Sequence, residues 1–279
     1  MDNSSSSFLL VAPNSYDVKW AINDHMHPER RCGRPNKRRA WLEWNNLVSL
    51  LVHTGAGIEI IQQKEGLYDM VFAANAGLTV GPKKVVLSFF RKKERQPEQA
   101  IFRKHFEEGG WRVLEISRRI FFEGQGDALF WGDELVVGYG KRTEKAAALW
   151  LERHLERDTL ALWLADPRWY HLDTCFAPMS RDTALYYPGA FGKESVRLLR
   201  EFARRKGRNL IAITEKDALA FICNLIPIGK TLLIPTPSRG SVILETLRSF
   251  DFIPLPLNMQ EFRKSGGAAR CLVFNKHSP

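Results

Sequence analysis

Apolar residues recur at helical spacing in five stretches of the chain, and this periodicity predicts an amphipathic helix in each. The stretches cover about residues 37–53, 94–108, 143–156, 193–206 and 241–249. Short runs rich in β-branched and aromatic residues lie between them and predict strands. These runs are residues 58–61, 85–89, 111–116, 135–137, 160–164, 210–213, 231–234 and 271–274. Because strands and helices alternate along the chain, the pattern indicates an α/β fold.

A weak repeat accompanies this alternation. An acidic residue opens an apolar turn-and-strand segment at Asp69, Asp127, Asp173, Asp217 and Glu261. Successive starts lie roughly 44 to 58 residues apart, a spacing typical of internal repeats. Five such units predict a closed propeller of small strand-and-helix modules, with the acidic turns converging on one central pocket.

The length and the N-terminus bear on domain organisation and location. With 279 residues, of which 44% are hydrophobic, the chain can bury a full core, and one compact domain over residues 8–279 is expected. The serine-rich residues 1–7 predict a disordered tail. They lack the basic region of a signal peptide, and the apolar run at residues 8–12 is too short to span a membrane. We therefore expect a cytoplasmic protein with no membrane partner.

The net charge of +10 raises the question of a nucleic-acid partner, because a clustered basic face is typical of phosphate binding. The densest basic stretches are residues 30–39 and 200–208. The second belongs to an amphipathic helix with a solvated face, so a nucleic-acid partner is not favoured. The sequence leaves the oligomeric state open, including a homo-oligomer.

The cysteine spacing and the glycine-containing segments indicate which cofactors and metal sites are not expected. The four cysteines form no CxxC pair and no zinc-type Cys/His set, so neither a disulfide framework nor a metal site is expected. Gly229-Lys230-Thr231 is followed by a strand rather than a helix, and Gly138-Tyr139-Gly140 lacks the third glycine of a dinucleotide motif. Nucleophilic chemistry without a cofactor is the leading option.

Three segments carry candidate catalytic groups. Cys271 follows a Ser-Gly-Gly loop at the predicted entrance of a strand, although a cysteine in such a place is more often a small buried hydrophobe than a nucleophile. Strand alternation places His171 and Asp173 on one face, where a structural histidine is the alternative. Glu123 and Asp127 lie on a glycine-rich turn, and a buried glutamate there could orient an imidazole.

Four segments occur in an order that resembles the pentein superfamily, which includes arginine deiminases, dimethylarginine dimethylaminohydrolases and amidinotransferases. They are residues 72–77 (Phe-Ala-Ala-Asn-Ala-Gly), 122–127 (Phe-Glu-Gly-Gln-Gly-Asp), 171–174 (His-Leu-Asp-Thr) and 265–271 (Ser-Gly-Gly-Ala-Ala-Arg-Cys). The resemblance implies a single catalytic domain, built as a propeller of five ββαβ-type modules around a central active-site pocket.

The resemblance also implies roles for individual residues. Cys271, His171 and Glu123 match the Cys-His-Glu set that acts on a guanidinium carbon, and Asp127 and Asp173 match carboxylates that line the pocket or hold guanidinium nitrogens. In the implied mechanism the Cys271 thiolate attacks, and His171 as imidazolium protonates the leaving amine.

Further substrate-binding positions follow from the same resemblance. Arg91 and Arg142 are similar to arginines that grip the substrate α-carboxylate, a task that suits a planar guanidinium. A surface charge before a helix is the alternative for either arginine. Asp17 and Asn23 resemble an N-terminal strand that faces the substrate.

Asn75 departs from the deiminases, which carry an aspartate at this position. An amide can donate to a carbonyl oxygen as well as accept, so Asn75 would tolerate a neutral ureido group and favour two successive hydrolyses. This resembles arginine dihydrolases and succinylarginine dihydrolases. We expect conversion of arginine to ornithine, ammonia and CO2 without a cofactor.

Other functions stay open at this point. Within enzymes these are a dimethylarginine dimethylaminohydrolase, an arginine deiminase and an amidinotransferase, all of which use the same cysteine chemistry. From another class, the pentein fold also serves as a non-catalytic ribosome-binding factor, and the positive charge would fit RNA. The complete Cys271, His171 and Glu123 set argues against that alternative.

Overall fold

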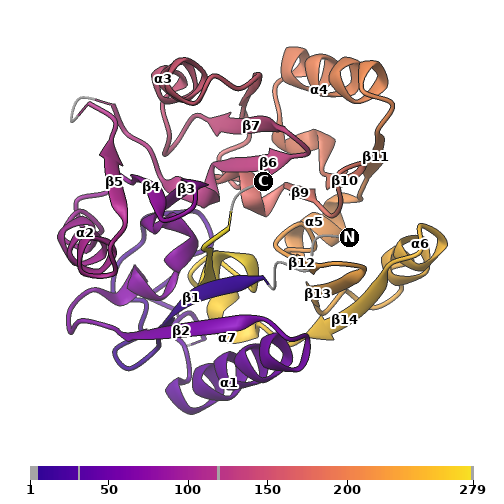
Figure 1. The fold of residues 1–279 in the computed structure, drawn as a ribbon. Coiled ribbons are helices and arrows are strands. Elements are labelled where there is room, and N and C mark those ends of the chain that lie inside the picture. The colour runs from indigo at the N-terminus through magenta and orange to yellow at the C-terminus, as the bar shows by residue number, and fades with distance from the viewer. Residues whose placement is uncertain (1–5, 31, 118–119, 278–279) are drawn as a thin grey trace.

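Five three-stranded sheets are arranged as a ring in the computed structural model, which describes residues 6–30, 32–117 and 120–277 (Figure 1). The sheets follow one another around the ring in chain order, and one long helix covers the outside of each. The predicted five-module α/β propeller is therefore confirmed. No helix within the described residues is long and apolar enough to cross a membrane.

Four of the five modules share one chain order, in which an antiparallel hairpin is followed by a helix and then by a third strand parallel to the second. The second module contains β3 (Gly77–Gly81), β4 (Lys84–Leu87), α2 (Glu98–Glu108) and β5 (Arg112–Glu115). The third contains β6 (Ala128–Trp131), β7 (Glu134–Tyr139), α3 (Lys145–Leu155) and β8 (Thr159–Trp163). The fourth contains β9 (Phe176–Pro178), β10 (Thr183–Tyr186), α4 (Lys193–Arg205) and β11 (Asn209–Ala212). The fifth contains β12 (Ile226–Ile228), β13 (Thr231–Pro235), α6 (Ile243–Ser249) and β14 (Ile253–Leu257).

The first module joins the two ends of the chain. Strand β15 (Val273–Asn275) pairs antiparallel with β1 (Ser7–Ala12), and β1 pairs parallel with β2 (Gly57–Gln62) after helix α1 (Lys37–His53). This closure supplies the hairpin that the other modules form from consecutive strands. Most of the expected tail, residues 1–5, lies outside the described residues, whereas Ser7 already belongs to β1.

Helix α1 shows why the predicted helices form. The side chain of Asn36 accepts a hydrogen bond from the backbone N–H of Arg39 at 3.0 Å, which caps the helix start. Trp44, Leu47 and Leu51 are buried at helical spacing and pack into the core. The other helices also lie within a few residues of their predicted bounds. The largest difference is at α2, which was predicted from about residue 94 but begins at Glu98, directly after Pro97.

Short turns precede the innermost strands and were not predicted. These are the 3-10 turns η1 (Tyr68–Val71), η2 (Ala73–Ala76), η3 (Gly124–Gly126), η4 (Leu172–Thr174) and η6 (Arg270–Leu272), and the short helices α5 (Glu215–Leu219) and α7 (Gln260–Arg263). The strand predicted from Cys271 therefore begins only at Val273. The strand alternation expected over residues 171–173 is also wrong, because Leu172 and Asp173 lie in η4.

The acidic residues of the repeat all lie in or beside these turns, but they do not all converge on one pocket. Asp217 accepts a hydrogen bond from Thr214 Oγ1 at 2.7 Å within its own module. Glu261 pairs with Lys264 at 2.6 Å. Glu261 Oε2 also accepts the backbone N–H of Asn36, next to the start of α1, at 2.7 Å. Because these two acids have such structural partners, the expected convergence holds only for the remaining acidic positions.

Candidate active site

The turns η2, η3, η4 and η6 directly precede β3, β6, β9 and β15, and they contact one another. η2 contacts both η3 and η6, and η3 contacts η4. Each turn presents polar side chains at the point where its strand begins. Segments far apart in sequence thereby place buried polar groups in one region.

Cys271 lies in η6 with only 2% of its surface exposed. Its Sγ lies 3.1 Å from Asp173 Oδ2, to which the thiol donates, and 3.0 Å from Asn224 Nδ2. Asn224 Oδ1 accepts the backbone N–H groups of Cys271 and Ala268 at 3.2 and 3.1 Å. Asn224 therefore holds both the loop and the thiol in place, a role that the sequence analysis did not predict.

The Cys271 thiol and the neighbouring Asp173 carboxyl group influence each other's pKa. Burial, reinforced by the Asp173 carboxylate, raises the pKa of Cys271 well above its usual range. Burial also raises the pKa of Asp173 to about 6, although the hydrogen bond from Cys271 works against it. These shifts favour a protonated Cys271 beside an ionised Asp173 near pH 7.

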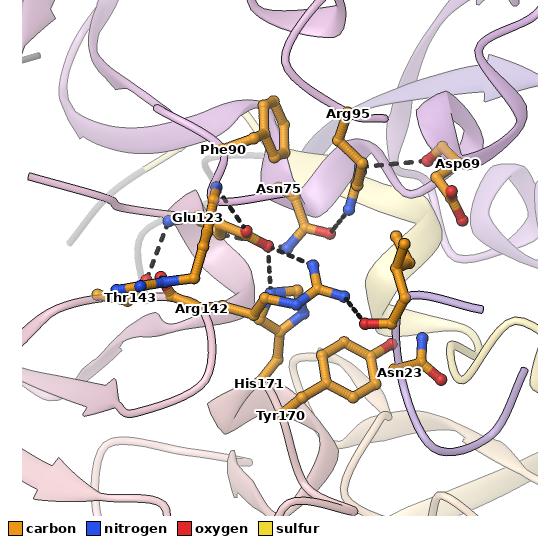
Figure 2. Close-up of polar contacts among 12 residues, drawn as sticks. Asn23, Asp69, Asn75, Phe90, Arg95, Glu123, Arg142, Thr143, Tyr170 and His171 are labelled. Atoms are coloured by element: carbon orange, nitrogen blue, oxygen red, sulfur yellow. Dashed lines mark hydrogen bonds and ion pairs between the residues drawn. The ribbon is translucent and has the colours of Figure 1, made fainter. Parts of the chain in front are cut away.

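His171 and Glu123 form a buried pair, with His171 Nε2 2.7 Å from Glu123 Oε2 (Figure 2). Burial alone would raise the pKa of Glu123, but the Arg142 guanidinium at 2.9 Å and the hydrogen bond with His171 hold it well below its usual range. Burial lowers the pKa of His171 to about 4 despite Glu123. Burial therefore favours a neutral imidazole in His171. The imidazolium expected during catalysis stays a prediction.

The side chain of Asp127 ties two of the turns together. Its Oδ2 accepts from Thr143 Oγ1 at 2.7 Å, and its Oδ1 accepts the backbone N–H of Leu172 at 3.0 Å. Burial and then the nearby Glu123 carboxylate raise the pKa of Asp127 well above its usual range. His171 Nε2 lies 3.8 Å from Asp127 Oδ2, so Asp127 lies beside the imidazole as well as supporting η4.

Both the nitrogen and the oxygen of the Asn75 side-chain amide form hydrogen bonds (Figure 2). Its Nδ2 donates to the backbone carbonyl of Glu123 at 3.1 Å, and its Oδ1 accepts from Arg95 Nη1 at 2.8 Å. Arg95 is buried and forms a bidentate pair with Glu98 at 2.9 and 2.8 Å. The orientation of Asn75 is thus fixed by Arg95, another residue that the sequence analysis missed.

Gly126 leaves the room that this arrangement needs. A Cβ at this position would lie 2.2 Å from Asn75 Nδ2 and 3.3 Å from His171 Nδ1. The first distance is far below normal contact. Only glycine therefore allows η3 to approach Asn75 and His171 this closely.

The two predicted carboxylate-binding arginines lie in different surroundings. Arg142 is 2% exposed, donates to Glu123 and to the backbone carbonyl of Ile22 at 3.0 Å, and stacks on the ring of Tyr170. The guanidinium of Arg91 instead pairs with Glu144 at 3.0 Å and stacks on Phe121. Only the backbone N–H of Arg91 reaches Glu123, at 3.2 Å.

The two predicted N-terminal substrate ligands, Asn23 and Asp17, also lie in different surroundings. Asn23 Nδ2 donates to the carbonyl of Ser265 at 2.9 Å, and Asn23 lines a pocket of about 270 Å³ together with Arg142 and Tyr170. Asp17 forms an ion pair with Arg34. Residues 16–23 form no strand, so the expected substrate-facing strand is wrong.

Asn224, Arg95 and Thr143 could not be assigned from the sequence, because each acts through a neighbouring residue and belongs to no motif. Asp69 had a weak signal as the first acidic residue of the repeat. It is buried, and its Oδ2 accepts from Trp20 Nε1 at 2.8 Å. Within the described part of the chain, no group of three or more His, Cys, Asp or Glu side chains is arranged to hold a metal ion.

Comparison with known proteins adds to this geometry. A family model described as N,N dimethylarginine dimethylhydrolase, eukaryotic, matches residues 16–278. The bifunctional arginine dihydrolase/ornithine cyclodeaminase AgrE of Nostoc sp. is 38% identical over 98% of this chain, and the match covers 38% of AgrE. The N(G),N(G)-dimethylarginine dimethylaminohydrolase of Mycobacterium tuberculosis is 29% identical over 97% of this chain and 85% of that protein. The chain thus spans less than half the length of AgrE.

Solved structures agree in fold. The N-terminal domain of ArgZ, a cyanobacterial arginine dihydrolase crystallised with its substrate, has a TM-score of 0.91 and 35% identity, with 99% of both chains covered. A dimethylarginine dimethylaminohydrolase from Pseudomonas aeruginosa has a TM-score of 0.78 at 18% identity, which supports the fold alone. The chain therefore belongs to the eukaryotic N,N dimethylarginine dimethylhydrolase family and has the fold of the pentein superfamily.

Proposed function

We propose that this chain is an arginine dihydrolase that hydrolyses the guanidinium group of arginine twice, releasing ornithine, two molecules of ammonia and CO2. Two water molecules are consumed, so the atoms balance. The observation that carries the proposal is the buried Cys271–Asp173 pair next to turns that hold His171, Glu123 and a neutral amide at Asn75. The likeness to AgrE and ArgZ, both named arginine dihydrolases, supports it.

Substrate binding would activate the thiol. Burial, and then the Asp173 carboxylate, raise the pKa of the thiol. A guanidinium cation bound beside Asp173 and Cys271 would offset both effects. The thiol proton would then pass to His171, whose imidazolium Glu123 stabilises. Thiolate and imidazolium would form together when the substrate binds, and each would stabilise the other.

The chemical steps follow from that pair. Cys271 Sγ forms a bond to the guanidinium carbon, and His171 protonates the departing amine, which leaves as ammonia. Water, deprotonated by His171, then breaks the C–S bond and leaves a ureido group. A second attack by Cys271 releases another ammonia, and hydrolysis of the remaining carbamoyl thioester gives ornithine's unsubstituted amine and CO2.

We propose that Arg142 and Asn23 bind the amino-acid end of the substrate, because both line the pocket beside Tyr170. Asp127 would hold η3 and η4 in register. Arg91 and Asp17 stay predictions as substrate ligands, because their charged groups pair with Glu144 and Arg34. The cytoplasmic location, the oligomeric state and the action of residues 8–279 as one catalytic domain also stay predictions.

A second candidate is dimethylarginine dimethylaminohydrolase activity, which the family match and the relative from Mycobacterium tuberculosis favour. Incubating the chain separately with arginine, dimethylarginine and succinylarginine, followed by amino-acid analysis and an ammonia assay, separates the possibilities. We expect ornithine and two ammonia per arginine consumed. If dimethylarginine were the only substrate consumed and citrulline its end product, the proposal would be wrong. Amidino transfer to an added amine would instead indicate a transferase.

A further inference from the structure

A second cavity, of about 170 Å³, lies on the axis of the ring beyond the candidate active site. Its wall includes Leu78 and Thr79 of β3, residues 128–130 of β6, and Asn275 of β15. These positions come a few residues after the turns that carry the catalytic candidates. Figure 1 shows β6, β9, β12 and the C-terminus close to the centre of the ring. The cavity thus lies farther along the inner strands than Cys271.

The lining keeps the two sites distinct. None of Cys271, His171, Glu123, Asn75 or Arg142 lines this cavity. The active-site side instead has its own pocket beside Arg142 and Tyr170. A ligand could therefore occupy the axial cavity without displacing a substrate at Cys271.

The floor of the axial cavity carries a cation without an ion-pair partner. Arg270 Nη1 donates to the backbone carbonyl of Val273 at 2.8 Å, and Nη2 donates to Gln125 Oε1 at 3.0 Å. Both acceptors are neutral. Across residues 6–30, 32–117 and 120–277, no carboxylate oxygen lies within 4.0 Å of this guanidinium. Asp173 influences Arg270 electrostatically, but its Oδ2 is already engaged by Cys271.

Arg270, whose side chain is partly buried, differs in this respect from the buried arginines Arg95 and Arg142. Arg95 pairs with Glu98 at 2.8 Å, and Arg142 pairs with Glu123 at 2.9 Å. A buried charge is costly unless it is paired, and burial accordingly lowers the pKa of Arg270. A guanidinium has five N–H groups, of which two have the acceptors named above, so others remain for a ligand.

The apolar part of the cavity wall determines which kind of anion would bind well. Besides Arg270 and the polar Thr79, Gln125, Asn275 and His277, the wall is apolar and includes Phe8, Leu129, Ala177 and Ile226. An inorganic anion would gain nothing from such a wall, whereas a short hydrocarbon group would be removed from water. The volume is below that of the usual pockets for drug-sized ligands, so the occupant must be small.

We propose that the axial cavity is a binding site for a small organic carboxylate, with its carboxylate on Arg270 and its apolar tail against the wall formed by Ala128, Ala177 and Ile226. The His277 side of the cavity gives access, because His277 lies on its rim and is exposed. The site is separate from the proposed hydrolysis and does not depend on its substrate.

Calorimetric titration of the full chain with 3-methylbutanoate tests the proposal. We expect saturable binding of one ligand per chain, and weaker binding of acetate, which has the same charge but little apolar surface. Arg270→Gln should weaken binding at least about tenfold, since it removes a charge-assisted hydrogen bond. Ala177→Leu, which fills the cavity and keeps the charge, should weaken it to a similar extent.

Arg142→Gln is the matched control, because it also removes a buried guanidinium but from the active-site pocket. Its affinity for 3-methylbutanoate should equal that of the unmodified chain, and circular dichroism should confirm that each variant is folded. Absence of saturable binding to the unmodified chain would overturn the proposal. So would equal affinities for acetate and 3-methylbutanoate, unchanged binding by a folded Ala177→Leu, or loss of binding in Arg142→Gln alone.

Discussion

Replacing Asn75 by aspartate tests how the site handles a neutral intermediate. In the present structure the Asn75 amide donates to the Glu123 carbonyl at 3.1 Å and accepts from Arg95 at 2.8 Å. Asn75→Asp loses the first bond, which costs about 1 kcal/mol, and strengthens the second by a charge-assisted contact of about 1.5–3 kcal/mol. The fold should therefore tolerate the change.

The added charge should instead alter which substrate is bound well. A carboxylate about 5 Å from a guanidinium gains about 3 kcal/mol at an effective dielectric constant of 20. A neutral ureido group gains none of this, so preference for arginine over citrulline should rise by about a hundredfold. Citrulline formed in the first hydrolysis should then leave before it is attacked again.

Amino-acid analysis of the products from arginine measures this shift. We expect ornithine from the unmodified chain and mainly citrulline from Asn75→Asp. Asn209→Asp is a suitable control, because it adds the same charge at an exposed position on β11 and should leave the product unchanged. An equal ratio of ornithine to citrulline in Asn75→Asp and the unmodified chain would refute the reasoning about the ureido group.

Two further predictions concern pH and close packing. Because burial raises the pKa of Asp173 to about 6, protonation below that pH removes the negative charge that would pair with the guanidinium. The acid limb of kcat/KM should fall with an apparent pKa near 6, and a limb near 4 would exclude Asp173 as the titrating group. Gly126→Ala should lower kcat at least about a hundredfold, since its Cβ would lie 2.2 Å from Asn75 Nδ2. Gly57→Ala should retain full activity, because the nearest atom to its Cβ would be the flexible Ser7 Oγ at 3.3 Å. Retained activity in both variants would contradict the packing argument.

The long helices could be predicted because each has a periodic apolar face that a single stretch of sequence records. The inner strands β9 and β12 could not, because they are only three residues long and follow tight turns. The strand predicted over residues 271–274 was found, although β15 begins only at Val273. The acidic repeat marked the module starts correctly. It did not reveal that Asp217 accepts from Thr214, or that Glu261 binds Lys264 and the backbone N–H of Asn36, since these partners depend on the folded structure.

The candidate site shows the same division. Cys271, His171 and Glu123 were identified through motif order, and the structure places His171 on Glu123 and Cys271 on Asp173. Asn224 and Arg95 escaped notice because their side chains act on residues 47 and 20 positions away in the sequence. The protonation states could not be inferred either, because they follow from burial, which only the fold determines.

In the proposed mechanism the thiol of Cys271 attacks the guanidinium carbon. Rapid mixing of the full chain with arginine, acid quenching and mass spectrometry of the digested peptides tests this step directly. We expect an arginine-derived adduct on the peptide containing Cys271. In Cys271→Ala the adduct should be absent and turnover should fall by at least about a thousandfold. Turnover that persists in Cys271→Ala, or an adduct on another residue, would contradict it.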